Sequence, residues 1–268
     1  MPRQLRLMCI LAHPDDESLG TGGILARYGA EGVQTYLLTA THGGMGWFGA
    51  PEDNPGPEAL GRLREQELGA AANVLGLKEV NLLGYQDGQL DRADPAEVTA
   101  RIVAHVRRVR PQVVVTFDPY GSYGHPDHIA ISQLATAALV AAADPDYANA
   151  SDAAHTVDKL YYFVVTPARI EAYEAAFGTL MMEIDGVQRR PPGWPYWAVT
   201  TRIDTADFAE QVWQATACHR SQLPNYQALR DLPPEKREYI WQTQSLYRVY
   251  SLVNGGRGVE RDLFAGLR

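Results

Sequence analysis

The chain is short of cysteine and of long apolar runs, and both shortages exclude classes of protein. Two cysteines, Cys9 and Cys218, occur in 268 residues, and they form no Cys-x-x-Cys pair. A disulfide framework is therefore excluded, and a reducing cytoplasm is the expected location. No apolar run approaches the ~20 residues that span a bilayer, so no membrane partner is expected. The first residues lead directly into an expected strand, so no signal peptide is expected either.

Positive charge is also scarce. The 24 Lys and Arg residues are outnumbered by 32 Asp and Glu residues, which gives a formal net charge of −8. Binding of nucleic acid requires clustered Lys and Arg side chains that contact phosphates. A short basic stretch at residues 107–110 ends an expected helix, where cations interact favourably with the helix dipole. We therefore expect no nucleic acid as a partner.

What the chain does have is a regular alternation of short apolar runs with segments of helical spacing. The expected strands are residues 5–12, 33–39, 79–83, 113–117 and 159–166, and the expected helices are residues 19–28, 58–75, 95–109 and 126–142. Residues 41–57 are rich in Gly and Pro and should form a loop. This alternation predicts an α/β fold with a mostly parallel sheet and helices on both faces.

After residue 166 the alternation is less clear. A loop at 189–197, helices at 204–218 and 233–243 and a strand at 246–253 are expected there. No internal repeat or linker divides the chain. We therefore expect a single domain over residues 1–268, with a core at 1–166 and C-terminal elements at 167–268 that complete a substrate pocket.

Two motifs that contain histidine follow the first and fourth expected strands. One runs from His13 to Glu17 (HPDDE), and the other from Tyr123 to His128 (YGHPDH). Either motif alone is compatible with an ordinary helix start. If the strand order is 3-2-1-4-5, however, the two strands are neighbours where the order reverses, which is where open parallel sheets bind ligands.

Together the motifs can form a metal site. Residues three apart at a helix start face the same way, so His13 and Asp16 can bind one ion, which His128 approaches from the other loop. Two imidazoles and one carboxylate leave a position for water, the pattern of catalytic zinc. The same ligands also suit Fe(II), Co(II) or Ni(II).

The remaining motif residues supply groups for amide hydrolysis. Asp15 can act as general base toward a water molecule. His125 can stabilise an oxyanion or protonate the leaving amine. Asp127 can orient His125, because carboxylates commonly fix the orientation of imidazoles near a metal.

The paired motifs resemble the LmbE-like N-acetylglucosaminyl deacetylases, also called the PIG-L family, over roughly residues 5–145. The resemblance implies a Rossmann-like fold, one zinc ion per chain and deacetylation of N-acetylglucosamine conjugates. It also places the metal ligands on His13, Asp16 and His128, the general base on Asp15 and the acid or oxyanion residue on His125. Further substrate-site residues implied by the family are Arg64, Asp87 and Tyr123.

Two other segments bear on the substrate. The family often has Gly-Glu in the loop after the second strand, whereas residues 41–46 read THGGMG and offer no such Glu. The segment HRSQ, which begins at His219, is similar to a His-x-Ser-Gln of members with thiol-cofactor substrates and implies that His219 borders the pocket. Trp194, Tyr196 and Trp197 can either stack on a sugar or pack in a subunit interface.

The sequence thus predicts a zinc-dependent N-deacetylase that releases acetate from a small amino-sugar conjugate, such as GlcNAc-malate or GlcNAc-inositol. Two alternatives stay open. One is an amidase of the same family that cleaves a bulkier thiol conjugate. The other is an inactive metal- or sugar-binding protein, which the presence of both Asp15 and His125 argues against. A homo-oligomer is expected from the family alone.

Overall fold

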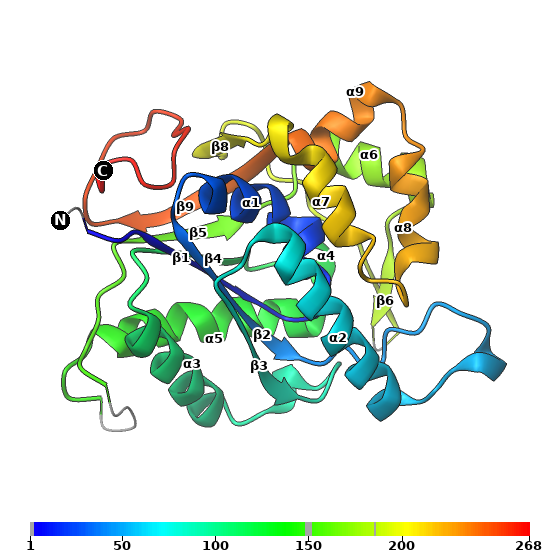
Figure 1. Ribbon diagram of the computed structural model, residues 1–268, viewed down its shortest axis with the longest axis horizontal. Coiled ribbons are helices and arrows are strands. Elements are labelled where there is room, and N and C mark those ends of the chain that lie inside the picture. The colour runs from blue at the N-terminus through cyan, green and yellow to red at the C-terminus, as the bar shows by residue number, and fades with distance from the viewer. Residues whose placement is uncertain (1–2, 148–151, 185) are drawn as a thin grey trace.

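The fold is built on a seven-stranded sheet of order β3-β2-β1-β4-β5-β9-β8 (Figure 1). The computed structural model describes residues 3–147, 152–184 and 186–268. The strands are β1 (Arg6–Leu11), β2 (Gln34–Thr41), β3 (Glu79–Tyr85), β4 (Val113–Phe117), β5 (Lys159–Phe163), β8 (Thr201–Asp204) and β9 (Thr243–Ser251). The first five are parallel, whereas β9 is antiparallel to both β5 and β8.

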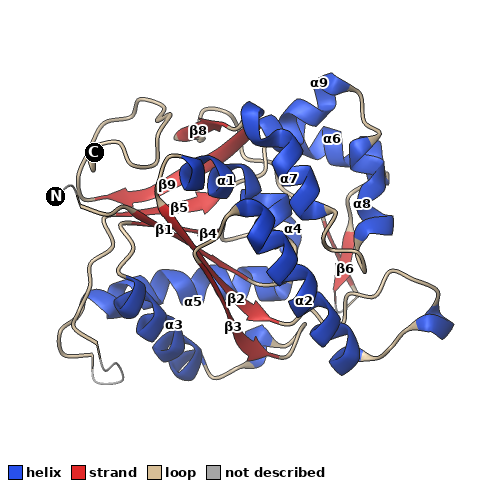
Figure 2. Cartoon of the chain, viewed as in Figure 1, coloured by secondary structure: helices blue, strands red, loops and turns tan. Residues whose placement is uncertain are grey.

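Helices cover both faces of this sheet, as Figure 2 shows, which confirms the predicted α/β, Rossmann-like class. On one face lie α1 (Gly22–Ala30), α2 (Pro57–Leu75) and α7 (Ala209–Thr216), and on the other lie α3 (Pro95–Val109) and α5 (Pro126–Ala143). Because both faces are covered, the central strands are apolar throughout: every residue of β4 is buried.

The strand order places the two histidine motifs side by side. The chain runs outward from β1 to β2 and β3, then returns to the other side of β1 with β4 and β5. The order therefore reverses between β1 and β4, as the hypothesis required. Each motif follows its strand by a few residues, so both loops lie at the carboxyl ends of neighbouring strands.

The C-terminal part of the chain differs more from the expected elements. It contains α6 (Pro167–Phe177), α8 (Leu223–Arg230), α9 (Pro234–Arg237) and a small hairpin of β6 (Met182–Ile184) and β7 (Val187–Arg189). The sequence did not predict α6, α8, β8 or the hairpin, because these elements are short and their apolar spacing is weak. The expected helix at 19–28 is also two pieces, a π-helical turn at Glu17–Thr21 followed by α1.

The C-terminal helices form a smaller apolar core beside the main one. Its members include Trp213 on α7, Tyr226 and Leu229 on α8, and Trp241 from the turn after α9. In Figure 1, α6, α8 and α9 stand at one end of the molecule, and α7 lies between them and α1. Within the described ranges, none of the helices has the length and apolar character that crossing a bilayer requires.

Candidate active site

Three side chains from the two motifs converge on one point. His13 Nδ1 lies 3.1 Å from His128 Nε2. Asp16 places one carboxylate oxygen 3.6 Å from His13 Nδ1 and the other 3.5 Å from His128 Nε2. The loop before His128 can fold tightly against α5 because residue 121 is glycine: a Cβ there would lie 2.7 Å from the Cβ of His128.

This arrangement fits a tetrahedral metal ion. Ligand atoms placed ~2.0–2.1 Å from zinc lie about 3.3–3.5 Å from one another. The two ring nitrogens lie near this separation, and Asp16 presents a different oxygen to each of them. Burial and the neighbouring His13 lower the pKa of His128 well below its ordinary value, so its ring is neutral and its Nε2 can bind a metal while Nδ1 faces the Gly121 carbonyl. The cluster of His13, Asp16 and His128 can therefore hold a divalent cation.

The other ring nitrogen of His13 faces carboxylates. Its Nε2 lies 3.0 Å from Asp87 Oδ1 and 3.1 Å from Asp127 Oδ2. Burial alone would lower the pKa of His13, but the hydrogen bonds with Asp127 and Asp87 outweigh burial and raise this pKa to about 10. Without a metal the His13 ring therefore carries a proton on both nitrogens. A metal would displace the proton of Nδ1 and leave the Nε2 proton on the carboxylates, the arrangement typical of ligating histidines.

This geometry moves the orienting role predicted for Asp127 from His125 to His13. The Asp127 carboxylate also accepts the backbone N–H groups of Gly88 and Leu90, at 2.7 and 3.0 Å. These contacts tie the turn after β3 to the start of α5. Asp87, which was predicted to contact substrate, also orients His13 through its Oδ1. Its Oδ2 accepts the backbone N–H of Met45 at 2.9 Å.

His125 lies beside His13 and His128. Its Nδ1 accepts the backbone N–H of Asp127 at 3.2 Å, so the proton of the neutral ring lies on Nε2. Burial and the nearby His13 lower the pKa of His125 to about 4, which keeps the ring neutral. Its ring centroid is 4.7 Å from that of His13, and Tyr123 packs edge-on against His125 and His128.

Asp15 stands beside the ligands in an unusual backbone conformation. Its φ of 109° lies in a region that residues other than glycine rarely adopt. Arg64 on α2 donates from one terminal nitrogen to Asp15 Oδ2 at 2.8 Å and to the carbonyl of Pro14. Its other terminal nitrogen donates to the carbonyl of Gly43 at 2.6 Å. Arg64, which the resemblance placed in the substrate site, is 3% exposed, and in this structure its contacts are with Asp15 and the neighbouring backbone.

His219 is likewise placed behind the motif. Its side chain is fully buried and its Nε2 lies 2.7 Å from Glu17 Oε1. The other oxygen of Glu17 accepts the Asp15 N–H at 3.0 Å. This revises the expected substrate contact of His219, because a side chain without exposed surface cannot touch a ligand unless the site rearranges. Glu17 ends the first motif and had no predicted role, although an acidic residue directly after His13 and Asp16 was a usable signal.

Two further segments were expected to bear on the substrate. The loop at residues 41–46, which lacks the family's Glu, contributes backbone groups: the Gly43 carbonyl and the Met45 amide. Trp194 donates from its ring nitrogen to Asp118 Oδ2 at 2.5 Å and packs against Tyr247. Trp194 is thus engaged within the fold, whereas Trp197 is 88% exposed.

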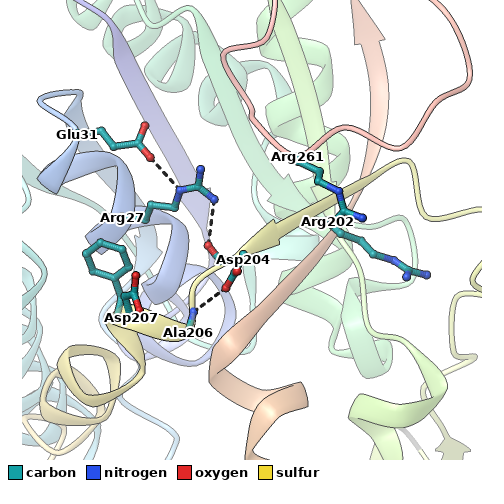
Figure 3. A pocket seen from close by; sticks show the side chains of 8 residues that line it. Arg27, Glu31, Arg202, Asp204, Ala206, Asp207 and Arg261 are labelled. Carbon is teal, nitrogen blue, oxygen red and sulfur yellow. Dashed lines mark hydrogen bonds and ion pairs between the residues drawn. The ribbon is translucent and has the colours of Figure 1, made fainter.

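A separate hollow of about 460 Å³ lies away from this cluster (Figure 3). It is lined by Arg27, Glu31, Arg202, Asp204, Ala206, Asp207, Phe208 and Arg261. Arg27 is held by Glu31 at 2.8 Å and by the Asp204 carbonyl at 3.0 Å, and Asp204 caps the next turn through the Ala206 N–H. The mixture of charges and these contacts are typical of an ordinary charged surface.

The fold and the cluster together define a class: an α/β protein that gathers histidine and carboxylate side chains at the carboxyl ends of its parallel strands. A family model described as "PIG-L: GlcNAc-PI de-N-acetylase" matches residues 8–139. Two relatives, from Streptomyces griseus subsp. griseus and Geodermatophilus obscurus, are each named 1D-myo-inositol 2-acetamido-2-deoxy-alpha-D-glucopyranoside deacetylase. They are 36% and 35% identical over 98% of this chain, covering 89% and 98% of their own lengths.

The chain is also similar in fold and sequence to a solved structure. The conserved protein TT1542 from Thermus thermophilus has a TM-score of 0.68 and 27% identity, over 94% of this chain and 98% of that one. The chain belongs to the PIG-L family, which confirms the resemblance carried by the two motifs. It also confirms the coarser prediction that the protein is a deacetylase.

Proposed function

We propose that this protein is a metal-dependent, and specifically a zinc-dependent, hydrolase that removes the acetyl group from an N-acetylglucosamine conjugate. The observation that carries the proposal is the convergence of His13, Asp16 and His128 beside Asp15, in a chain similar to GlcNAc-inositol deacetylases. The names of those relatives favour an inositol aglycone over malate. The product would be acetate and a free amino sugar.

The protein would hold its metal through His13 Nδ1, His128 Nε2 and Asp16. Asp87 and Asp127 would fix the ring of His13 through its Nε2–H. When bound, zinc supplies a Lewis acid that polarises the amide carbonyl and lowers the pKa of a neighbouring water. Asp16 must be ionised to ligate, which the metal charge favours against the burial that raises the pKa of this carboxyl to about 7.

Asp15 would transfer the proton during the reaction, and His125 would donate a hydrogen bond to the substrate. Asp15 takes a proton from the attacking water as a new C–O bond forms, and it then passes this proton to the amine nitrogen as the C–N bond breaks. His125, neutral and protonated at Nε2, donates a hydrogen bond to the carbonyl oxygen as negative charge develops there. Tyr123 packs against both histidines and would border the acetamide.

Asp15→Asn tests this assignment. We expect acetate release to fall by about 10²–10⁴-fold, because the base is lost, while one zinc ion per chain is retained. Acetate would be measured with GlcNAc-inositol, GlcNAc-malate and a simple GlcNAc glycoside, and zinc by elemental analysis. Asp207→Asn, an exposed carboxylate in the hollow of Figure 3, is the matched control and should keep wild-type activity.

Near-normal turnover in Asp15→Asn would contradict the mechanism. The same panel separates the alternatives. Chelator-sensitive acetate release establishes the deacetylase, and the preferred member identifies the aglycone. Cleavage of only a bulkier thiol conjugate would indicate the amidase, and zinc binding without release from any substrate would indicate an inactive binder.

A further inference from the structure

The carboxylate of Asp15 is held at one oxygen by side chains from two distant parts of the chain. Arg64 on α2 donates to Asp15 Oδ2 at 2.8 Å, and the hydroxyl of Tyr226 on α8 donates to the same oxygen at 2.7 Å. Among the described residues, no group donates a hydrogen bond to Oδ1. The side chain of Asp15 keeps 11% of its surface exposed. One oxygen is thus fixed and the other is available to a water molecule.

The backbone of Asp15 also needs support. A φ of 109° costs energy for a residue with a Cβ, and such conformations persist where the surroundings hold them. Glu17 supplies one support by accepting the Asp15 N–H at 3.0 Å, and His219 fixes Glu17 in turn. The segment that contains His219 and Tyr226 therefore contacts the first motif twice, once behind it and once at the carboxylate.

Tyr226 itself is well fixed. It is 8% exposed and packs in the smaller core with Trp213 and Leu229. Burial and the negative charge of Asp15 raise the pKa of the phenol well above its ordinary value, so the hydroxyl stays protonated and donates. The packing of α8 thereby sets the position of a hydrogen-bond donor at the general base.

We propose that Tyr226 is a positioning residue for the deacetylation: with Arg64, it holds Asp15 Oδ2 so that Oδ1 alone receives the proton of the attacking water. This inference rests on the proposed function. Tyr226 acts through Asp15 and does not touch the substrate. Its removal should therefore slow the chemical step and leave substrate affinity and metal binding intact.

The zinc-loaded Tyr226→Phe variant tests the proposal. We expect kcat to fall by about 10- to 100-fold, as for other residues that orient catalytic groups, with KM within about twofold of wild type. Zinc content should be unchanged. Tyr161→Phe is the matched control, because it removes another buried hydroxyl that donates to a carboxylate, Glu260, away from the site. It should keep wild-type kcat at a similar loss of thermal stability.

A double-mutant cycle shows whether Tyr226 acts through Asp15. In an Asp15→Ala background, Tyr226→Phe should reduce the residual rate no further, since the group that it positions is gone. An equal further reduction would overturn the proposal. Unchanged kcat in Tyr226→Phe alone, or a raised KM with unchanged kcat, would also overturn it.

Crystal structures of the wild type and Tyr226→Phe give a readout that does not depend on turnover. A rotated Asp15 carboxylate or a relaxed Asp15 φ in the variant supports the inference, and an unmoved Asp15 overturns it. Wild-type protein that releases no acetate from any GlcNAc conjugate would contradict the proposed function. The crystal structures would then still decide whether Tyr226 positions Asp15.

Discussion

Two buried clusters of charged groups in this protein differ in how they are satisfied. One is the group of His13, Asp16 and His128 at the ends of β1 and β4, called here the ligand cluster. The other surrounds Lys159, the first residue of β5, whose ammonium donates to Glu260 Oε1 at 2.8 Å and to the carbonyls of Leu263 and Ala265 at 3.2 and 3.0 Å. These three contacts use all three donors of the ammonium.

Glu260 completes the second cluster from the acceptor side. Its Oε2 accepts the hydroxyls of Tyr161 and Thr201 at 2.8 and 3.1 Å, and its Oε1 also pairs with Arg248 at 2.9 Å. One carboxylate and backbone carbonyls therefore receive both cations, and the cluster ties the last residues of the chain to the sheet. In the ligand cluster, by contrast, His13 Nδ1 and His128 Nε2 face each other at 3.1 Å with Asp16 beside them.

The comparison teaches how to tell a structural cluster from a functional one. Donors match acceptors around Glu260, so this cluster needs nothing further. The ligand cluster brings together two imidazole nitrogens and a carboxylate, which need a shared positive charge, either a proton on His13 or a metal ion, to lie this close. Its mutation should therefore affect metal and turnover, whereas mutation of Glu260 should affect folding.

The largest expected effect follows from a change in the ligand cluster. His128→Leu removes a ligand at similar volume, so bound zinc should be lost and acetate release should fall by at least ~10³-fold. The unfolding free energy of the metal-free protein should change by no more than about 1 kcal/mol, since apolar replacement of buried polar groups is often neutral. Zinc analysis, acetate assays and urea unfolding measure these quantities. Retained stoichiometric zinc would show that His128 is no ligand.

Glu260→Ala should give the opposite result. It leaves Lys159 and Arg248 without their carboxylate, and breaking a buried pair in this way costs about 3–5 kcal/mol of unfolding free energy. The kcat of the folded fraction should stay within about twofold of wild type. Glu31→Ala is the control, since it removes surface pairs with Arg27 and Arg268 that are each worth at most about 1 kcal/mol. A large loss of kcat at full occupancy of the folded state would remove the distinction between the clusters.

The sequence was most informative where a residue's neighbours are set by strand order. The spacing of His13, Asp16 and His128 and the alternation of strands up to residue 166 are enough to predict their meeting, because parallel strands end at the same edge of the sheet. The residues that support them could not be predicted in the same way. Tyr226 lies on a short helix with weak periodicity, and its contact with Asp15 depends on how the C-terminal helices pack.

The assignments of Arg64 and His219 show a related limit. Both were expected near the substrate, and both lie near the catalytic residues, but their side chains point to Asp15 and Glu17 from behind. Resemblance to a family places a residue in a region of the fold. Whether that residue lines the pocket or supports its wall depends on burial, which only the packed structure provides.

The smallest expected effect is a dependence of stability on pH that belongs to Glu260 alone. Burial would raise its pKa, but hydrogen bonds from Asn254, Lys159 and Tyr161 outweigh burial and lower this pKa from 4.5 to about 2. A carboxyl group whose pKa is lower in the folded state stabilises the fold above its unfolded pKa, and this stabilisation is lost as the pH falls through the folded value. The stability gap between wild type and Glu260→Gln, measured by urea unfolding, should therefore be constant above about pH 5 and narrow between pH 4.5 and 2. A gap that does not change with pH would mean that the cluster stabilises the fold through packing and not through charge.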